Sequence, residues 1–136
     1  MKTSRPLVLI VGVIFLAVGV VLGGRYLIRQ RFNQQRPIVI PKLSSEAIAG
    51  EAAFLANCAA CHGKNAAGTD KGPPLVNPIY SAAHHSDFSF VRAVALGVPQ
   101  HHWLFGAMPA QPQMARQQIE QMIVYIRELQ KANGIR

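Results

Sequence analysis

The chain has 136 residues, of which 50% are hydrophobic, and a formal net charge of +8 at pH 7. Residues 1–36 contain six of the 14 basic side chains and no acidic one, whereas residues 37–136 contain eight basic and six acidic side chains. The excess of positive charge therefore belongs to the N-terminal end, and the nearly balanced remainder gives no reason to expect nucleic-acid binding.

Residues 1–24 predict a signal anchor that stays in the membrane as a transmembrane helix. Lys2 and Arg5 precede an uncharged apolar run at positions 7–24, and about 18 residues are enough to cross a bilayer. A cleavable signal peptide has a shorter apolar stretch, of about 7–15 residues, and a small-residue cleavage site. No such site follows the run before Arg25.

Residues 25–43 are expected to be a basic, proline-containing tether, favoured as an extended linker. The alternative is that Ile38, Val39 and Ile40 pair as a short strand or rest on the domain. Pro37 and Pro41 interrupt any helical pattern, because a residue before proline is biased toward extended conformations. Residues 44–136 then form one globular domain, which is small for a self-sufficient hydrophobic core. A serine followed by Glu46 predicts that the first helix of this domain begins near residue 44.

The segment Cys58-Ala59-Ala60-Cys61-His62 carries the chemistry of the chain. A C-x-x-C-H pattern is typical of c-type haem attachment. Two thiols at this spacing can form thioethers with the two vinyl groups of one haem, and the histidine that follows binds the iron. The chain has only these two cysteines, so one covalent haem accounts for both.

Three other interpretations of this segment are weaker. A structural zinc site requires four ligands, commonly from paired clusters, and no second cluster occurs at a suitable spacing. A thioredoxin-like redox motif is expected beside a βαβ pattern, and no alternating strand pattern is visible. A disulfide between Cys58 and Cys61 leaves His62 unexplained.

The attachment motif also bears on the topology. Four arginines follow the apolar run, and the positive-inside rule alone would keep that flank in the cytoplasm. Covalent haem attachment occurs outside the bacterial cytoplasm, so we expect a single-pass protein of the bacterial inner membrane with its haem domain in the periplasm. The arginines then lie against anionic lipid headgroups on the outer face; they are Arg25, Arg29, Arg31 and Arg36.

Three further segments follow the motif. Residues 63–72 are rich in glycine and charge and are expected to form a loop. Residues 87–96 have a short helical pattern carried by Phe88, Val91 and Ala95. Residues 113–132 predict a last helix, which Asn133 and Gly134 end; its apolar side chains recur at three- and four-residue steps and are Ile119, Met122, Ile123, Ile126 and Leu129.

Residues 44–133 resemble a class I c-type cytochrome, a small monohaem one with an N-terminal anchor. The resemblance rests on Gly50-x-x-x-Phe54-x-x-x-Cys58-x-x-Cys61-His62, on Gly72-Pro73-Pro74-Leu75, on Gly106-Ala107-Met108-Pro109, and on a terminal amphipathic helix containing Tyr125-Ile126. It implies an all-α fold whose first and last helices cross beside the haem. Gly50 would then permit close approach of the last helix at about Met122 or Tyr125.

The resemblance also assigns roles around the iron. Cys58 and Cys61 form the thioethers, and His62 binds iron through one ring nitrogen. The other ring nitrogen donates a hydrogen bond to the carbonyl of Pro73, which fixes the ring. Leu75 packs on the proximal haem edge.

Met108 is the expected sixth ligand, since Gly106 and Pro109 flank it as in the family. Met114, a histidine and an open position are the alternatives, whereas Met122 is explained by core packing. A thioether opposite histidine raises the haem potential and suits electron transfer.

Trp103 is expected in the distal wall of the haem pocket, where its indole N–H could hold a haem propionate. The pairs His84-His85 and His101-His102 depart from a minimal family member. Ordinary hydrogen bonding is the simplest role for them. A contact with a haem propionate and a second metal site are the alternatives.

These observations predict a one-electron carrier with one covalent haem c, and not an enzyme. By family analogy its partners are redox proteins: a membrane quinol-oxidising complex as donor and a terminal oxidase or reductase as acceptor. Two alternatives remain: a haem-based binder or sensor of a small ligand, and a fixed cytochrome subunit of a membrane redox complex.

Overall fold

The computed structural model describes the backbone of residues 5–33 and 37–136, and the side chains of residues 9–25 and 37–136. The chain divides into two compact units, Met1–Arg36 and Pro37–Arg136. The second unit therefore begins at Pro37, seven residues before the predicted start of the globular domain at residue 44. The first four residues and residues 34–36 lie outside the described part; the latter include Arg36 of the predicted tether.

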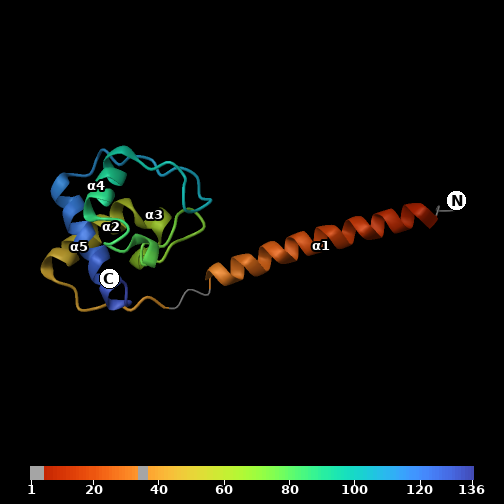
Figure 1. The fold of residues 1–136 in the computed structure, drawn as a ribbon, viewed down its shortest axis with the longest axis horizontal. Coiled ribbons are helices and arrows are strands. Elements are labelled where there is room, and N and C mark those ends of the chain that lie inside the picture. Colours follow the sequence, from red (N-terminus) through yellow and green to blue (C-terminus); the bar gives the residue numbers. More distant parts are fainter. Residues whose placement is uncertain (1–4, 34–36) are drawn as a thin grey trace. The chain divides into compact units, whose positions relative to one another are not determined.

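The first unit consists of one helix, α1 (Arg5–Asn33) (Figure 1). All the large apolar side chains at positions 9–22 are exposed, including Phe15 at 74%. The helix extends through residues 25–33, which we had expected in the tether, because no glycine or proline interrupts them. Within the described residues, no helix is long and apolar enough to cross a membrane.

The second unit is helical, as the predicted all-α class requires. Its elements are α2 (Ser45–Asn57), α3 (Ala59–His62), η1 (Lys64–Ala66), η2 (Pro78–Tyr80), α4 (Asp87–Leu96) and α5 (Arg116–Ala132). Between residues 37 and 136, the extended pairing is limited to an isolated antiparallel bridge of Val98 with Met108. Figure 1 shows the short helices and loops of this unit gathered around α2 and α5.

The core lies where α2 packs on α5. A Cβ atom on Gly50 would lie 1.9 Å from the carbonyl oxygen of Gln121, so only glycine allows the two backbones to approach this closely. The predicted close approach of Gly50 to the last helix is thus confirmed. Next to it the rings of Phe54 and Tyr125 pack with centroids 5.6 Å apart, and both side chains are fully buried.

The predicted helix starting near residue 44 is confirmed, since Ser44 caps α2 and its Oγ accepts a hydrogen bond from the N–H of Ala47 at 3.1 Å. Helix α4 has the predicted bounds of 87–96, but its buried face differs from the expected one. Phe90 and Val94 are buried, whereas Phe88 is 71% exposed. Phe90 and Val94 are four residues apart, so they lie on the same face of α4, and this face packs against the core.

Helix α5 begins at Arg116, three residues later than predicted from the apolar pattern. Ala115 is still extended, and its N–H donates to Oε1 of Gln118 at 2.9 Å, which ends the preceding turn and starts the helix. The predicted stop is confirmed, because Asn133 follows the last residue of α5. The Asn133 side chain also binds the N–H and the carbonyl of Val39, both at 2.9 Å. Residues 37–43 are thus attached to the domain instead of forming a free linker.

Candidate functional site

A cavity of about 470 Å³ lies among α3, α4 and the loop that joins α4 to α5. Its volume is within the range of about 300–1,000 Å³ found for small-molecule and cofactor sites. Six of the seven predicted site residues line it: Cys58, His62, Pro73, Leu75, Trp103 and Met108. The seventh, Cys61, lies at the end of the same motif and is exposed. The fold therefore gathers three segments that are far apart in sequence around one space.

His62 is buried at the end of α3, with its ring held by one hydrogen bond. Its Nδ1 lies 2.9 Å from the carbonyl oxygen of Pro73. A carbonyl can only accept, so Nδ1 carries the proton and Nε2 of the neutral ring keeps its lone pair. Burial lowers the pKa of His62, and the bond to Pro73 opposes this shift in part. The predicted contact is present, and it prepares Nε2 as a metal ligand.

The loop after His62 folds back because its backbone is satisfied locally. The N–H of Gly68 donates to the carbonyl of His62 at 2.6 Å, and the N–H of Leu75 donates to that of Ala66 at 2.9 Å. Gly68 has a φ of 83°, and a Cβ there would lie 2.7 Å from the nitrogen of Pro74. This region was expected to be loop; it contains the 3₁₀ turn η1, in which Asn65 also has positive φ.

Cys58 and Cys61 are not joined by a disulfide and lie in different surroundings. Cys58 is buried, and its Sγ lies 3.6 Å from Sδ of Met122. Burial, with a smaller contribution from Cys61, raises the pKa of the Cys58 thiol from 9.0 to about 11. Cys58 thus faces the cavity, whereas Cys61 is exposed.

Met108 enters the cavity from the loop between α4 and α5. It is fixed by its bridge to Val98, whose N–H and carbonyl each make a 2.9 Å hydrogen bond with Met108. Met114 is only 8% exposed but belongs to the core and does not line the cavity. Met122 lines the cavity beside Cys58. Among the three methionines, Met108 alone reaches the cavity from a loop that is separate from the attachment motif.

Trp103 lies in the cavity wall as predicted, and its Nε1–H donates to the hydroxyl of Tyr80 at 3.1 Å. The histidine pairs stand at the same cavity: His85, His101 and His102 are among its lining residues. His85 and His101 make the ordinary hydrogen bonds that were expected, from Nδ1 to the carbonyls of Ile79 at 2.6 Å and Pro99 at 2.9 Å.

Sequence reasoning missed the side chains that hold the loops of this site on α5. Arg127 donates to the carbonyls of Tyr80 at 2.7 Å and His85 at 2.6 Å, and its guanidinium lies 4.9 Å from the centre of the Phe90 ring. Gln130 donates to the carbonyl of Leu75 at 2.8 Å. The sequence hint that could have identified Arg127 and Gln130 is their spacing: two polar residues three positions apart on the inner side of an amphipathic helix.

The donor set suits a covalently attached haem. The cavity is lined mainly by apolar side chains, and it offers one imidazole with a free Nε2 lone pair and a thioether from a second segment. Two thiols stand next to that imidazole in the chain, one of them facing the cavity. These are the groups that bind and anchor a haem iron in His/Met sites.

Comparison with known proteins agrees with this assignment. The family model for cytochrome c matches residues 47–130, which is 84 of the 136 residues and runs from the start of α2 to the end of α5. A search of curated proteins and a search of solved structures each found no match. The chain therefore belongs to the cytochrome c family, and it is a haem-based electron carrier with covalently bound haem c.

Proposed function

We propose that the protein is a membrane-anchored monohaem cytochrome that carries single electrons in a periplasmic respiratory or redox chain. One observation carries the proposal: His62 and Met108, from segments 46 residues apart, line the same largely apolar cavity. In such a site the haem iron supplies a one-electron couple between its ferrous and ferric states.

In this proposal each residue has a limited task. Cys58 and Cys61 anchor the haem through thioethers, and His62 provides Nε2 while Pro73 keeps its ring oriented. Met108 would provide its sulfur as the second protein ligand of the iron. These residues hold the iron in one coordination geometry, so little rearrangement accompanies a change in its charge.

Two further side chains keep water from the iron. Leu75 is 8% exposed and belongs to both the core and the cavity wall. Trp103 closes another part of the wall and is tied to Tyr80 by its indole N–H. A dry site with both axial positions held favours electron transfer over ligand binding.

The membrane attachment rests on α1. Its large apolar side chains at positions 9–22 are exposed, and a continuous exposed apolar surface of this kind favours a lipid environment. The basic residues that flank it favour anionic headgroups. We place the haem domain on the periplasmic side of a bacterial inner membrane.

An anchor of this kind raises the concentration of the haem domain near membrane redox enzymes. The partners that fit are a quinol-oxidising complex as electron donor and a terminal oxidase or reductase as acceptor. Membrane fractionation tests the anchor: the full chain should stay in the membrane after carbonate extraction, and a chain that begins at Pro37 should be soluble. Extraction of the full chain by carbonate would contradict the anchor.

The haem function is tested by the absorption spectrum of the dithionite-reduced, detergent-solubilised protein before and after carbon monoxide. We expect no spectral change, because both axial positions are occupied by protein ligands. Prompt, stoichiometric binding of carbon monoxide would contradict the electron-carrier assignment and favour a haem-based binder of small ligands. A Leu104→Ala variant is a suitable control, since Leu104 lies in the Met108 loop but is 93% exposed.

A further inference from the structure

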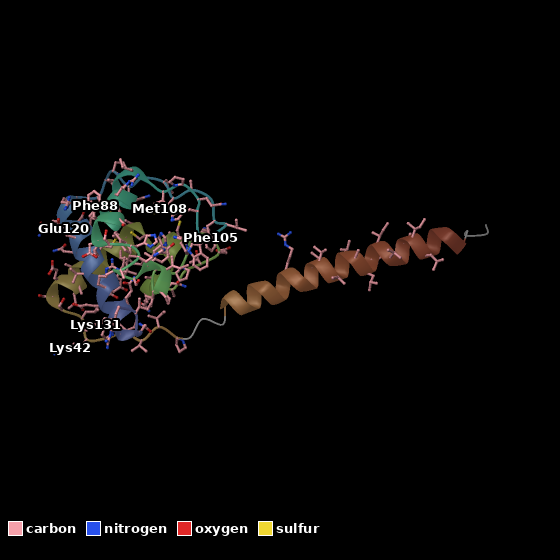
Figure 2. The ribbon with its side chains drawn as sticks, viewed as in Figure 1. Lys42, Phe88, Phe105, Met108, Glu120 and Lys131 are labelled. Atoms are coloured by element: carbon pink, nitrogen blue, oxygen red, sulfur yellow. The ribbon has the colours of Figure 1, made fainter. Side chains whose placement is uncertain are left out.

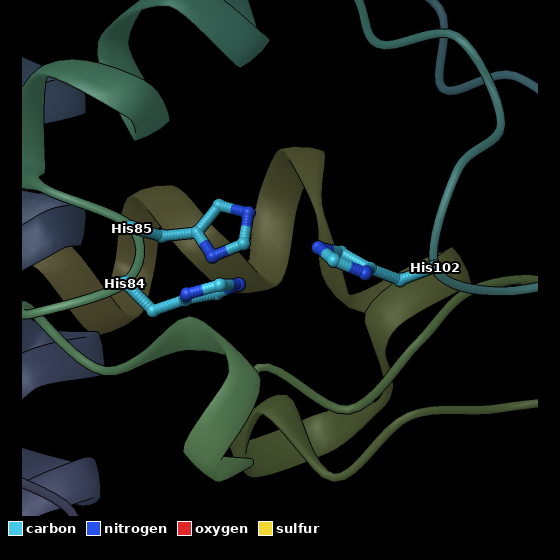
Figure 3. A group of neighbouring side chains, drawn as sticks. All are labelled: His84, His85 and His102. Carbon is cyan, nitrogen blue, oxygen red and sulfur yellow. The ribbon is translucent and has the colours of Figure 1, made fainter.

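Three histidines outside the iron-ligand set lie close together beside the cavity. His84 and His85 follow η2, and His102 belongs to the loop after α4. Each offers a ring nitrogen, and these atoms all lie within 4.8 Å of one another. Figure 3 shows the rings of His84 and His85 projecting from one segment toward the ring of His102, which comes from another. The fold thus brings together two histidine pairs that are separated in sequence.

The ring of His85 is already oriented by a hydrogen bond that leaves Nε2 for a metal. Its Nδ1 lies 2.6 Å from the carbonyl oxygen of Ile79, so Nδ1 is the donor and Nε2 of the neutral ring has the free lone pair. Arg127 donates to the carbonyl of His85 at 2.6 Å and fixes the backbone at this position. Metal-binding histidines are commonly oriented by such a bond from the second ring nitrogen.

The three rings crowd one another, and His102 responds to this crowding. Desolvation and the neighbouring rings of His101, His85 and His84 lower the pKa of His102. The three ring centroids are 4.9, 5.8 and 5.4 Å apart, so protonated rings would repel one another. When the rings are not protonated, their three nitrogen lone pairs can bind one metal cation together.

We propose that His84, His85 and His102 form a second metal site, at the side of the haem cavity, for a late divalent transition metal such as Cu²⁺ or Zn²⁺. Imidazole ligands suit these metals, and the trio contains no carboxylate that would favour calcium or magnesium. Three histidines leave a fourth position open to water or to an external ligand.

The geometry needs only side-chain adjustment. Zinc–nitrogen bonds of about 2.0–2.1 Å in a tetrahedral site put the nitrogen atoms about 3.4 Å apart. His84 and His102 are exposed, so their rings can rotate toward His85, whose ring is already held. The proposal rests on the proposed function, in which Met108 is the sixth iron ligand and His84, His85 and His102 are not bound to the iron.

A metal at this place would also influence the haem domain. His85 and His102 line the cavity, whereas His84 does not, so the bound cation would stand at the cavity wall. A positive charge near the iron favours its reduced state. We therefore expect the haem reduction potential to rise when the site is filled, and to return when the metal is removed by a chelator.

Isothermal titration of the holoprotein, made without a polyhistidine tag and freed of metal with a chelator, tests the proposal with ZnCl₂ and CuCl₂ as probes. We expect one equivalent of either metal to bind, copper more tightly than zinc. His84→Asn and His102→Asn should each weaken binding at least about tenfold. Nitrogen hyperfine structure in the electron paramagnetic resonance spectrum of the copper-loaded protein should report the imidazole ligands.

His101→Asn is the matched control, because His101 packs on His102 with centroids 4.4 Å apart but does not belong to the trio. It should retain the affinity of the unaltered protein. Absence of one-equivalent binding would overturn the proposal, as would equal weakening by His101→Asn and His84→Asn. His84 is exposed and outside the cavity lining, so an unchanged haem spectrum of His84→Asn shows that its result is not a folding defect.

Discussion

The two sides of the haem cavity are built in different ways. On the His62 side, residues 58–75 form a tight loop in which Gly68 binds the carbonyl of His62 at 2.6 Å and Pro73 binds its ring at 2.9 Å. On the Met108 side, the backbone of Met108 makes two 2.9 Å bonds with Val98, and the rest of the loop between α4 and α5 is held by scattered bonds, such as that of the Gln111 N–H to the carbonyl of Val94 at 2.7 Å. Leu104, in the same loop, is 93% exposed (Figure 2 shows its neighbour Phe105 at the edge of the domain).

In the proposed site, this difference would make His62 the more firmly held iron ligand and Met108 the more easily displaced one. Three features fix the position of His62: its place in the attachment motif, its place in α3, and the hydrogen bond from its ring to the carbonyl of Pro73. Met108 depends on one bridge in a loop with few buried side chains. Segments with few buried contacts open at lower free energy than the rest of a fold. We expect ligand loss, when it occurs, to begin at Met108.

The largest expected effect comes from exchanging one glycine on each side. Gly68→Ala places a Cβ 2.7 Å from the nitrogen of Pro74 at a φ of 83°, so overpacking and backbone strain add, and stability should fall by about 3 kcal/mol. Gly106→Ala has a φ of 85° but open space around the new atom, so its cost should be about 1 kcal/mol. Guanidinium unfolding followed by haem absorbance measures both. Equal losses would break the comparison.

A smaller effect is expected at Arg127, which fastens the loop before α4 to α5. Arg127→Met leaves the His85 carbonyl without its 2.6 Å donor and the side-chain oxygen of Gln130 without its 2.7 Å donor. Stability should fall by about 2 kcal/mol, because these groups are poorly reached by water. Denaturant unfolding gives the value, and hydrogen exchange should show the added opening around residues 80–86.

Asp87→Asn is the matched control for Arg127. It removes the 2.8 Å ion pair with Nε of Arg127, but the Asp87 side chain is 67% exposed. An exposed carboxylate of this kind contributes about 0–1 kcal/mol. A loss at Asp87→Asn as large as that at Arg127→Met would mean that the ion pair, and not the bonds to the loop, gives Arg127 its role.

A smaller effect than that of Arg127→Met is expected at the bond between Tyr80 and Trp103, which joins η2 to the Met108 loop. Tyr80→Phe removes the hydroxyl that accepts the 3.1 Å bond from Trp103 and keeps the ring, so stability should fall by about 1 kcal/mol. Trp103→Phe removes the same bond, and the double variant should lose less than the sum of the two single losses. If the loss of stability of the double variant equalled the sum of the two single losses, Tyr80 and Trp103 would not be coupled. Unfolding of the four proteins supplies the cycle.

Sequence reasoning was strongest where the chemistry is local. The C-x-x-C-H segment, Gly50 and the prolines near Pro73 have fixed spacings, and the structure gathers them as expected. Ser44 and Asn133 were recognisable as helix ends because capping is a property of a few neighbouring residues. The same reasoning placed the start of α5 three residues too early, at Gln113, because residues 112–114 form a turn and a bend and Ala115 is still extended.

The remaining parts depend on contacts between distant segments. Arg127 donates to the carbonyls of Tyr80 and His85, which are 47 and 42 residues away in the sequence. A local sequence pattern cannot predict which distant backbone carbonyl will accept such a bond. The helical pattern of α4 was recognised from Phe88, Val91 and Ala95, and only the packing shows that Phe90 and Val94 are its buried residues. The meeting of His84 and His85 with His102 likewise follows from the path of two loops.

The central claim is that Met108 completes the coordination of the iron opposite His62. The most direct measurement is the far-red sulfur-to-iron charge-transfer band of the oxidised protein in Met108→Ala, with Met114→Ala as the control methionine of the core. The account predicts that the band disappears in Met108→Ala and persists in Met114→Ala, although the latter should be less stable by about 2–4 kcal/mol. Persistence of the band in Met108→Ala would contradict the account.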